Sequence, residues 1–86
     1  MTMEVDANLM NVVVDRFGRD VNAAPSADGR TTTVTVPVCK SPVLYGWLAT
    51  LGDDAEVLHP KTLRDGYSGW LKRIYARYGN RSGAAN

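Results

Sequence analysis

The chain has few of the residues on which disulfides, metal sites and acid–base catalysis depend: its 86 residues include one cysteine and one histidine. With Cys39 alone, no disulfide can form within the chain, and a reducing compartment fits this composition. Cys39 follows a predicted strand, where we expect a buried thiol. The alternative is a reactive thiol beside Lys40.

Long hydrophobic runs are also absent. No stretch approaches the roughly 20 apolar residues of a membrane-spanning helix, so we expect no membrane partner. Met1 is followed by acidic residues rather than by a basic and then an apolar stretch. We therefore expect no secretory leader and a cytoplasmic location.

No catalytic motif is present, and we expect neither an enzyme, a metal site nor a bound cofactor. His59 precedes Pro60 at a predicted strand end, and no acidic or thiol partner stands at a metal-ligand spacing from it. Asp53 and Asp54 are neighbours in a predicted turn, where adjacent side chains point apart into solvent. A catalytic His59 and a paired-carboxylate site are the disfavoured alternatives.

Charge is unevenly distributed along the chain. Residues 1–58 carry four basic and eight acidic side chains, whereas residues 59–86 carry six basic and one acidic. A basic C-terminal segment on an acidic body either meets nucleic acid or pairs with that body.

The clearest helix signals lie between residues 41 and 52. Ser41 is a good N-cap, Pro42 suits the first helical position, and Gly52 ends the helix. Four apolar residues at helical spacing form one face, with Trp47 expected to be buried at its centre: Leu44, Trp47, Leu48 and Leu51.

Two further helices are predicted. The first follows an N-cap at Asn8 and closes at Gly18. The last begins near Pro60 or Lys61 and is predicted to end at Gly79. Gly66 and Gly69 weaken it, which indicates close packing against a neighbour at both positions. Its apolar stripe consists of Leu63, Tyr67, Trp70, Leu71, Ile74 and Tyr78.

Four strands complete the pattern, over residues 2–6, 19–24, 31–38 and 55–58. In residues 31–38, threonines face one way and valines the other, and Pro37 indicates an edge or the end of pairing. The order is strand, helix, strand, strand, helix, strand, helix. We predict an α+β, ferredoxin-like β-α-β-β-α-β sandwich with a four-stranded antiparallel sheet, two helices on one face and an extra C-terminal helix. Residues 1–79 form the domain and residues 80–86 a flexible tail.

Three segments carry a family resemblance: NLMNVVVDRFGRDV, TVTVPVCKSPVLYGWLATLGDDAEVLHPKTLRDGY and WLKRIYARY. Their shared features are Arg16-Phe17-Gly18, Gly46-Trp47-Leu48, the Gly52 turn, the strand from Ala55 to Pro60, and Leu63-Arg64. In order and spacing, over residues 5 to 79, they resemble the C-terminal extension (WCX) domain of WYL-domain transcriptional regulators of bacteria.

The resemblance implies a place in a longer protein. Such regulators resemble a relay of a DNA-binding winged helix-turn-helix, a sensing WYL domain and this ferredoxin-like extension, which is associated with dimer formation and effector response. The implied partners are a second copy and the WYL domain of the same full-length protein. The closeness of Met1 to the first strand indicates an excised piece of such a regulator.

The candidate site residues lie on the last helix. Four basic residues are candidates for contact with single-stranded nucleic acid or a small acidic effector: Lys61, Arg64, Arg73 and Arg77. Four stripe residues are candidate dimer contacts: Tyr67, Trp70, Ile74 and Tyr78. Aromatic rings here, including Tyr75, are also able to stack on bases, and the stripe is alternatively core of a monomer. For Arg64, a salt bridge to Asp65 or to the acidic body is the favoured interpretation.

Overall fold

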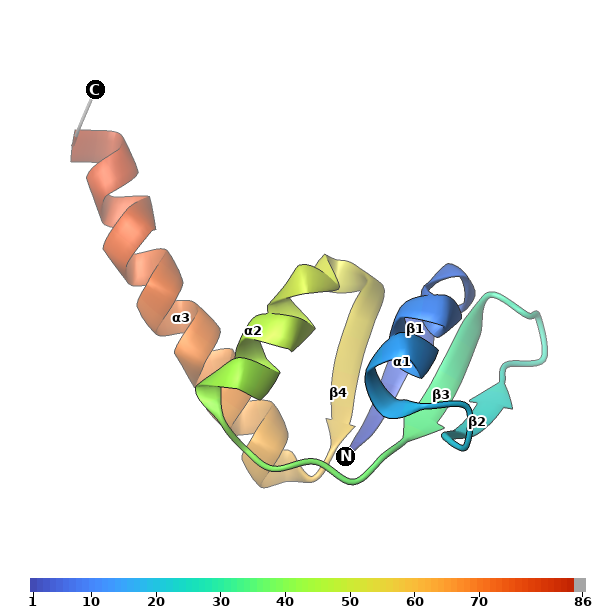
Figure 1. Ribbon diagram of the computed structural model, residues 1–86. Helices are drawn as coiled ribbons and strands as arrows, with labels where there is room; N and C mark the ends of the chain where they lie inside the picture. Colours follow the sequence, from blue (N-terminus) through green and yellow to red (C-terminus); the bar gives the residue numbers. More distant parts are fainter. Residues whose placement is uncertain (85–86) are drawn as a thin grey trace.

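The computed structural model describes the backbone of residues 1–84 and the side chains of residues 1–79. The described residues form four strands and three α-helices, in the order strand, helix, strand, strand, helix, strand, helix (Figure 1). The strands are β1 (Thr2–Asp6), β2 (Asn22–Pro25), β3 (Thr31–Thr35) and β4 (Ala55–His59), and the helices are α1 (Met10–Phe17), α2 (Pro42–Thr50) and α3 (Lys61–Ala84). Two 3-10 turns, η1 (Ala7–Leu9) and η2 (Gly52–Asp54), precede α1 and β4.

The four strands form one antiparallel sheet in the order β2-β3-β1-β4. Met3 lies at its centre, opposite Val34 on β3 and Val57 on β4. This order follows from the split βαβ pattern, because β1 and β4 become neighbours and β2 and β4 become the two edges. The predicted fold class is therefore confirmed.

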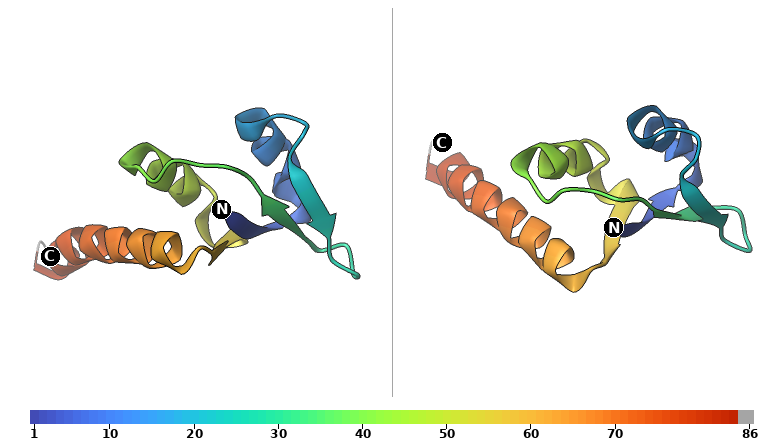
Figure 2. Two further views of the ribbon diagram at one scale, coloured as in Figure 1. Left: turned by 90° about the horizontal axis from the view of Figure 1, so that it is seen from below. Right: turned by 60° about the horizontal axis from the view of Figure 1, so that its bottom comes forward.

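One face of the sheet carries the core. Met3 and Val5 are fully buried, whereas Glu4 between them is exposed, as strand alternation requires. Helices α1 and α2 lie side by side on the buried face (Figure 2). The core consists of Met3, Val5, Val13, Val34, Val36, Leu44, Tyr45, Leu48, Val57 and Leu63.

Helix α2 starts as its sequence predicts. The Ser41 hydroxyl accepts a hydrogen bond from the backbone N–H of Leu44 at 3.1 Å, and Pro42 is the first helical residue. At the other end, Gly52 has φ 62°, which a side-chain-bearing residue rarely adopts. The capping prediction for α1 was wrong: its N-cap is Leu9, which makes no side-chain capping bond. Asp6 instead caps the preceding turn η1, where its carboxylate accepts from the backbone N–H of Asn8 at 2.8 Å.

Several other predictions need correction. Strand β3 ends at Thr35, two residues before Pro37, which has no N–H to continue the ladder. Cys39 lies in the link beyond that strand and is exposed, so the expected buried thiol was wrong. Trp47 is only partly buried, because Leu44 and Leu48 occupy the centre of the core.

Helix α3 is longer than predicted and extends past the body. It continues to Ala84 instead of ending at Gly79, and its 24 residues span about 36 Å. The radius of gyration is 14.6 Å, against roughly 12 Å for a compact chain of this length. Figure 1 shows the second half of α3 running clear of the sheet. The flexible tail predicted for residues 80–86 stays a prediction, and residues 85–86 lie outside the described part.

Candidate interaction surface

The first turns of α3 are tied to the free edge of β4. One Arg64 nitrogen, Nη1, donates to the Glu56 carboxylate and to the Val57 carbonyl oxygen, both at 2.6 Å. Leu63 is buried beside it. Since β4 is an edge strand, its outward carbonyls lack a strand partner, and Arg64 satisfies one of them. The favoured interpretation of Arg64, a salt bridge to the acidic body, is thus confirmed.

A second ion pair lies within α3. The Lys61 ammonium contacts the Asp65 carboxylate at 2.6 Å, one helical turn away. This hydrogen bond holds the pKa of the Asp65 carboxyl below its usual range. Both side chains are mostly in solvent, so the pair adds little to stability.

An aromatic cluster joins α3 to α2. The ring of Tyr45 lies 5.6 Å from those of both Tyr67 and Trp70, measured between centroids, and the latter two are 6.1 Å apart. Desolvation in this cluster raises the pKa of the Tyr67 phenol. Tyr45 is buried, which was not predicted from the sequence; its position three residues before Leu48, on a neighbouring part of the helix surface, was the available signal.

Close approach of the two helices depends on Gly66. A Cβ atom built there would lie 2.5 Å from the Tyr45 hydroxyl oxygen, too near for any side chain. Close packing is therefore confirmed at Gly66. At Gly69 close packing is absent, because a Cβ atom built there would lie 3.5 Å from its nearest neighbour, the Nη1 atom of Arg73 in the same helix.

Beyond the aromatic cluster, the apolar stripe of α3 is exposed to solvent. Leu71 and Ile74 are 39% and 40% exposed, and Tyr75 and Tyr78 are 72% and 67% exposed. These four residues recur at helical spacing and form what we call the outer stripe. Monomeric proteins seldom leave such a run of large apolar side chains in solvent, so the outer stripe is a candidate contact surface.

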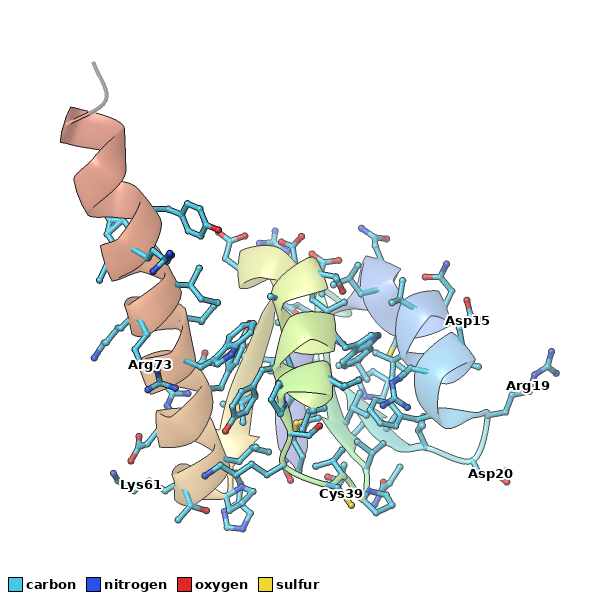
Figure 3. All side chains as sticks on the ribbon, turned by 60° about the vertical axis from the view of Figure 1, so that its left-hand side comes forward. Asp15, Arg19, Asp20, Cys39, Lys61 and Arg73 are labelled. Atoms are coloured by element: carbon cyan, nitrogen blue, oxygen red, sulfur yellow. The ribbon has the colours of Figure 1, made fainter. Side chains whose placement is uncertain are left out.

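Positive charge accompanies the outer stripe. Residues 66–79 contain Lys72, Arg73 and Arg77 and no acidic residue. Among the described side chains, none of these three takes part in an ion pair. Figure 3 shows Lys61 and Arg73 projecting from α3 into solvent.

The body presents the opposite charge. A hollow of about 200 Å³ lies where η2 meets the open side of the sheet, lined by carboxylates from three segments. Those carboxylates are Glu4, Asp6, Asp53, Asp54 and Glu56. The described residues include no group of three or more His, Cys, Asp or Glu side chains arranged to hold a metal ion.

Comparison with known families places the chain. The sequence model of the WCX domain matches residues 1–75. The chain belongs to the WCX domain family. The WCX domain is the C-terminal domain of WYL-type regulators, as the resemblance of the three sequence segments implied. No curated protein and no solved structure matches the chain.

Of the eight predicted site residues of this WCX domain, six fall into two groups, and the other two, Arg73 and Arg77, are exposed without an ion-pair partner among the described side chains. Lys61, Arg64, Tyr67 and Trp70 contact other residues of the same chain, through ion pairs or aromatic packing. Ile74 and Tyr78 belong to the exposed outer stripe. His59 is exposed at the end of β4. Among the described residues, none of the helices combines the length and apolar character that a membrane crossing requires.

Proposed function

We propose that this WCX domain is a non-catalytic oligomerisation and effector-response module of a WYL-family transcriptional regulator. The observation that carries the proposal is the outer stripe, because a helix that leaves Ile74 and Tyr78 in solvent gains by burying them against a partner. Its partners are then a second copy and the WYL domain of the same full-length protein, in the cytoplasm.

Charge indicates how two copies meet. Pairing α3 with the α3 of a second copy would bring Lys72, Arg73 and Arg77 of both chains together, and like charges oppose such contact. Laying α3 against the acidic hollow of the partner instead sets these three cations against Asp53, Asp54 and their neighbours. In a twofold arrangement this contact forms twice, since α3 of each copy lies against the acidic hollow of the other.

Charge reversal tests this arrangement. We expect Arg77→Glu and Asp54→Lys each to weaken dimerisation about tenfold in low salt, and the double variant to recover much of the loss. Lys61→Glu is the matched control, since Lys61 already pairs within α3. Sedimentation equilibrium gives the dissociation constants. Additive losses in the double variant would contradict the arrangement, and a wild type that never dimerises would contradict the oligomerisation itself.

A second candidate is a direct binding module for single-stranded nucleic acid or a small acidic effector through α3. The favouring observation is that Arg73 and Arg77, without ion-pair partners among the described side chains, flank the exposed rings of Tyr75 and Tyr78. Fluorescence anisotropy with an oligothymidine separates the two proposals. An affinity that falls steeply with salt and drops in Arg77→Gln supports this candidate, whereas no binding at low salt excludes the nucleic-acid form of it.

A further inference from the structure

Two adjoining hollows border the C-terminal end of α1, apart from α3. The first, of about 420 Å³, is bounded by the end of α1 at Arg16 and Phe17, by the link from Pro37 to Cys39, and by the start of α2. The second, of about 560 Å³, shares Arg16, Phe17 and Pro37 with the first and continues toward β2. Each has a volume in the range of small-molecule sites in proteins, roughly 300–1,000 Å³.

Two side chains on the walls of the first hollow, Arg16 and Ser41, are able to donate hydrogen bonds. Arg16 holds its guanidinium carbon 5.1 Å from the centroid of the Phe17 ring, and Phe17 in turn meets Trp47 edge-on at 5.2 Å. Among the described side chains, no carboxylate lies within ion-pair distance of Arg16. Its N–H groups are therefore positioned by aromatic contact but not neutralised.

The start of α2 adds to this positive character. Ser41 lines the first hollow, and its Oγ already accepts a hydrogen bond from Leu44, so its O–H is left to donate. Ser41 is also the N-cap of α2, so the positive end of the helix dipole borders this hollow. Phe17 and Val38, both partly buried, supply apolar surface beside these donors. Among the described residues that line the two hollows, Asp20 is the one acidic residue, and it lines only the second.

From this combination we infer that the paired hollows bind a small ligand with an anionic group and an apolar ring. The carboxylate or phosphate pairs with Arg16 and accepts a hydrogen bond from the Ser41 hydroxyl, while the ring packs on Phe17 and Val38. The inference rests on the effector-response part of the proposed function, for which it names the effector class and a location away from the basic residues of α3.

Cys39 provides the readout. It is the only thiol in the chain, is exposed, and lines the first hollow. A bound ligand should therefore slow its alkylation by iodoacetamide, a neutral reagent. We expect benzoate and phenyl phosphate to protect Cys39 saturably, and their relative affinities distinguish a carboxylate from a phosphate effector. Benzyl alcohol, which lacks the charge, and inorganic phosphate, which lacks the ring, should protect much less.

Arg16→Gln should weaken protection by about tenfold, the scale of a lost charge-assisted hydrogen bond. Arg19→Gln is the matched control, because Arg19 lines neither hollow and points away from the body in Figure 3. No protection by either ring anion, equal protection by benzyl alcohol or by inorganic phosphate, or unchanged protection in Arg16→Gln would each overturn the inference. Sedimentation of Arg16→Gln keeps the two proposals apart, since loss of the ligand site should leave dimerisation intact.

Discussion

The hydroxyl oxygen of Tyr45 lies 2.5 Å from the point that a Cβ atom at Gly66 would occupy. Tyr45 belongs to α2 and Gly66 to α3, so this pair sets how closely the two helices approach. The ring of Tyr45 cannot move aside easily, because Tyr67 and Trp70 pack against it. The position of α3 on the body therefore depends on the missing side chain at residue 66.

Gly66→Ala should destabilise the domain even though alanine favours helices by about 1 kcal/mol over glycine. Overpacking a position of this kind costs about 1–3 kcal/mol, so we expect a net loss of roughly 1 kcal/mol in urea unfolding. Gly69→Ala is the matched control in the same helix, where the nearest atom is the flexible end of Arg73. It should gain about 1 kcal/mol. Equal stability of the two variants would show that α3 is not held by this contact.

Tyr45→Phe should stabilise the domain by about 1 kcal/mol, because the buried hydroxyl has no hydrogen-bond partner among the described residues. In the Tyr45→Phe background, Gly66→Ala should become much less costly, which a double-mutant cycle measures directly. A Tyr45→Phe protein that unfolds more easily than the wild type would mean that the hydroxyl is hydrogen-bonded in solution.

Arg64→Met should lower the free energy of unfolding by about 1 kcal/mol, since it removes the contacts with Glu56 and with the Val57 carbonyl oxygen at the edge of the sheet. Lys61→Met breaks the other ion pair of α3 and should change stability by less than about 0.5 kcal/mol. Chemical denaturation of both variants checks the difference. Identical values would show that the edge of β4 does not depend on Arg64.

Hydrogen bonds in the turn between β2 and β3 should make the stability of the fold depend on pH. The Ser26 hydroxyl donates to the Asp28 carboxylate at 2.6 Å, and the Arg30 backbone N–H donates to the same oxygen at 3.0 Å, which together lower the pKa of Asp28. A lowered pKa means that the ionised carboxylate stabilises the fold above its ordinary pKa, and that this contribution is lost as the pH falls through the lowered value.

A carbon-detected NMR titration should find the pKa of Asp28 below its ordinary value of 3.8. Ser26→Ala should raise that pKa, because it removes the largest cause of the shift. Asp28 titrating identically in both proteins would contradict the hydrogen bond between the two side chains.

Much of the fold could be predicted because its signals are local. Ser41 and Pro42 start α2 whatever the rest of the chain does, and the alternation of Met3 and Val5 with charged neighbours gives β1 its buried face. The element order then specifies the sheet, since few arrangements accommodate a split βαβ unit.

The predictions were wrong where the burial of a residue or the end of an element depends on more than the local sequence pattern. Trp47 shares its helical face with Leu44 and Leu48, and only the position of α1 leaves it at the margin of the core, against Phe17. Cys39 is exposed because pairing stops before Pro37. Gly79 ends no helix because a glycine in a helix costs only about 1 kcal/mol.

The candidate site was predicted in part for the same reason. The spacing of the apolar residues placed Tyr67, Trp70, Ile74 and Tyr78 on one face of α3, but spacing does not show where the body ends. Only the packing of Tyr45 separates the inner residues of this face from the exposed ones. Similarly, the hollows beside Arg16 arise from segments distant in sequence.

Self-association through the outer stripe is the central claim, and it is tested most directly by sedimentation equilibrium of the wild type and Tyr78→Glu over a range of concentrations. Tyr78 is 67% exposed, so its substitution should leave the fold intact, whereas Trp70→Glu should unfold the domain by breaking the contact with Tyr45. Circular dichroism verifies both expectations. The account predicts a wild type that dimerises with rising concentration and a folded Tyr78→Glu that stays monomeric; a wild type that remains monomeric, or a Tyr78→Glu that dimerises equally well, would contradict it.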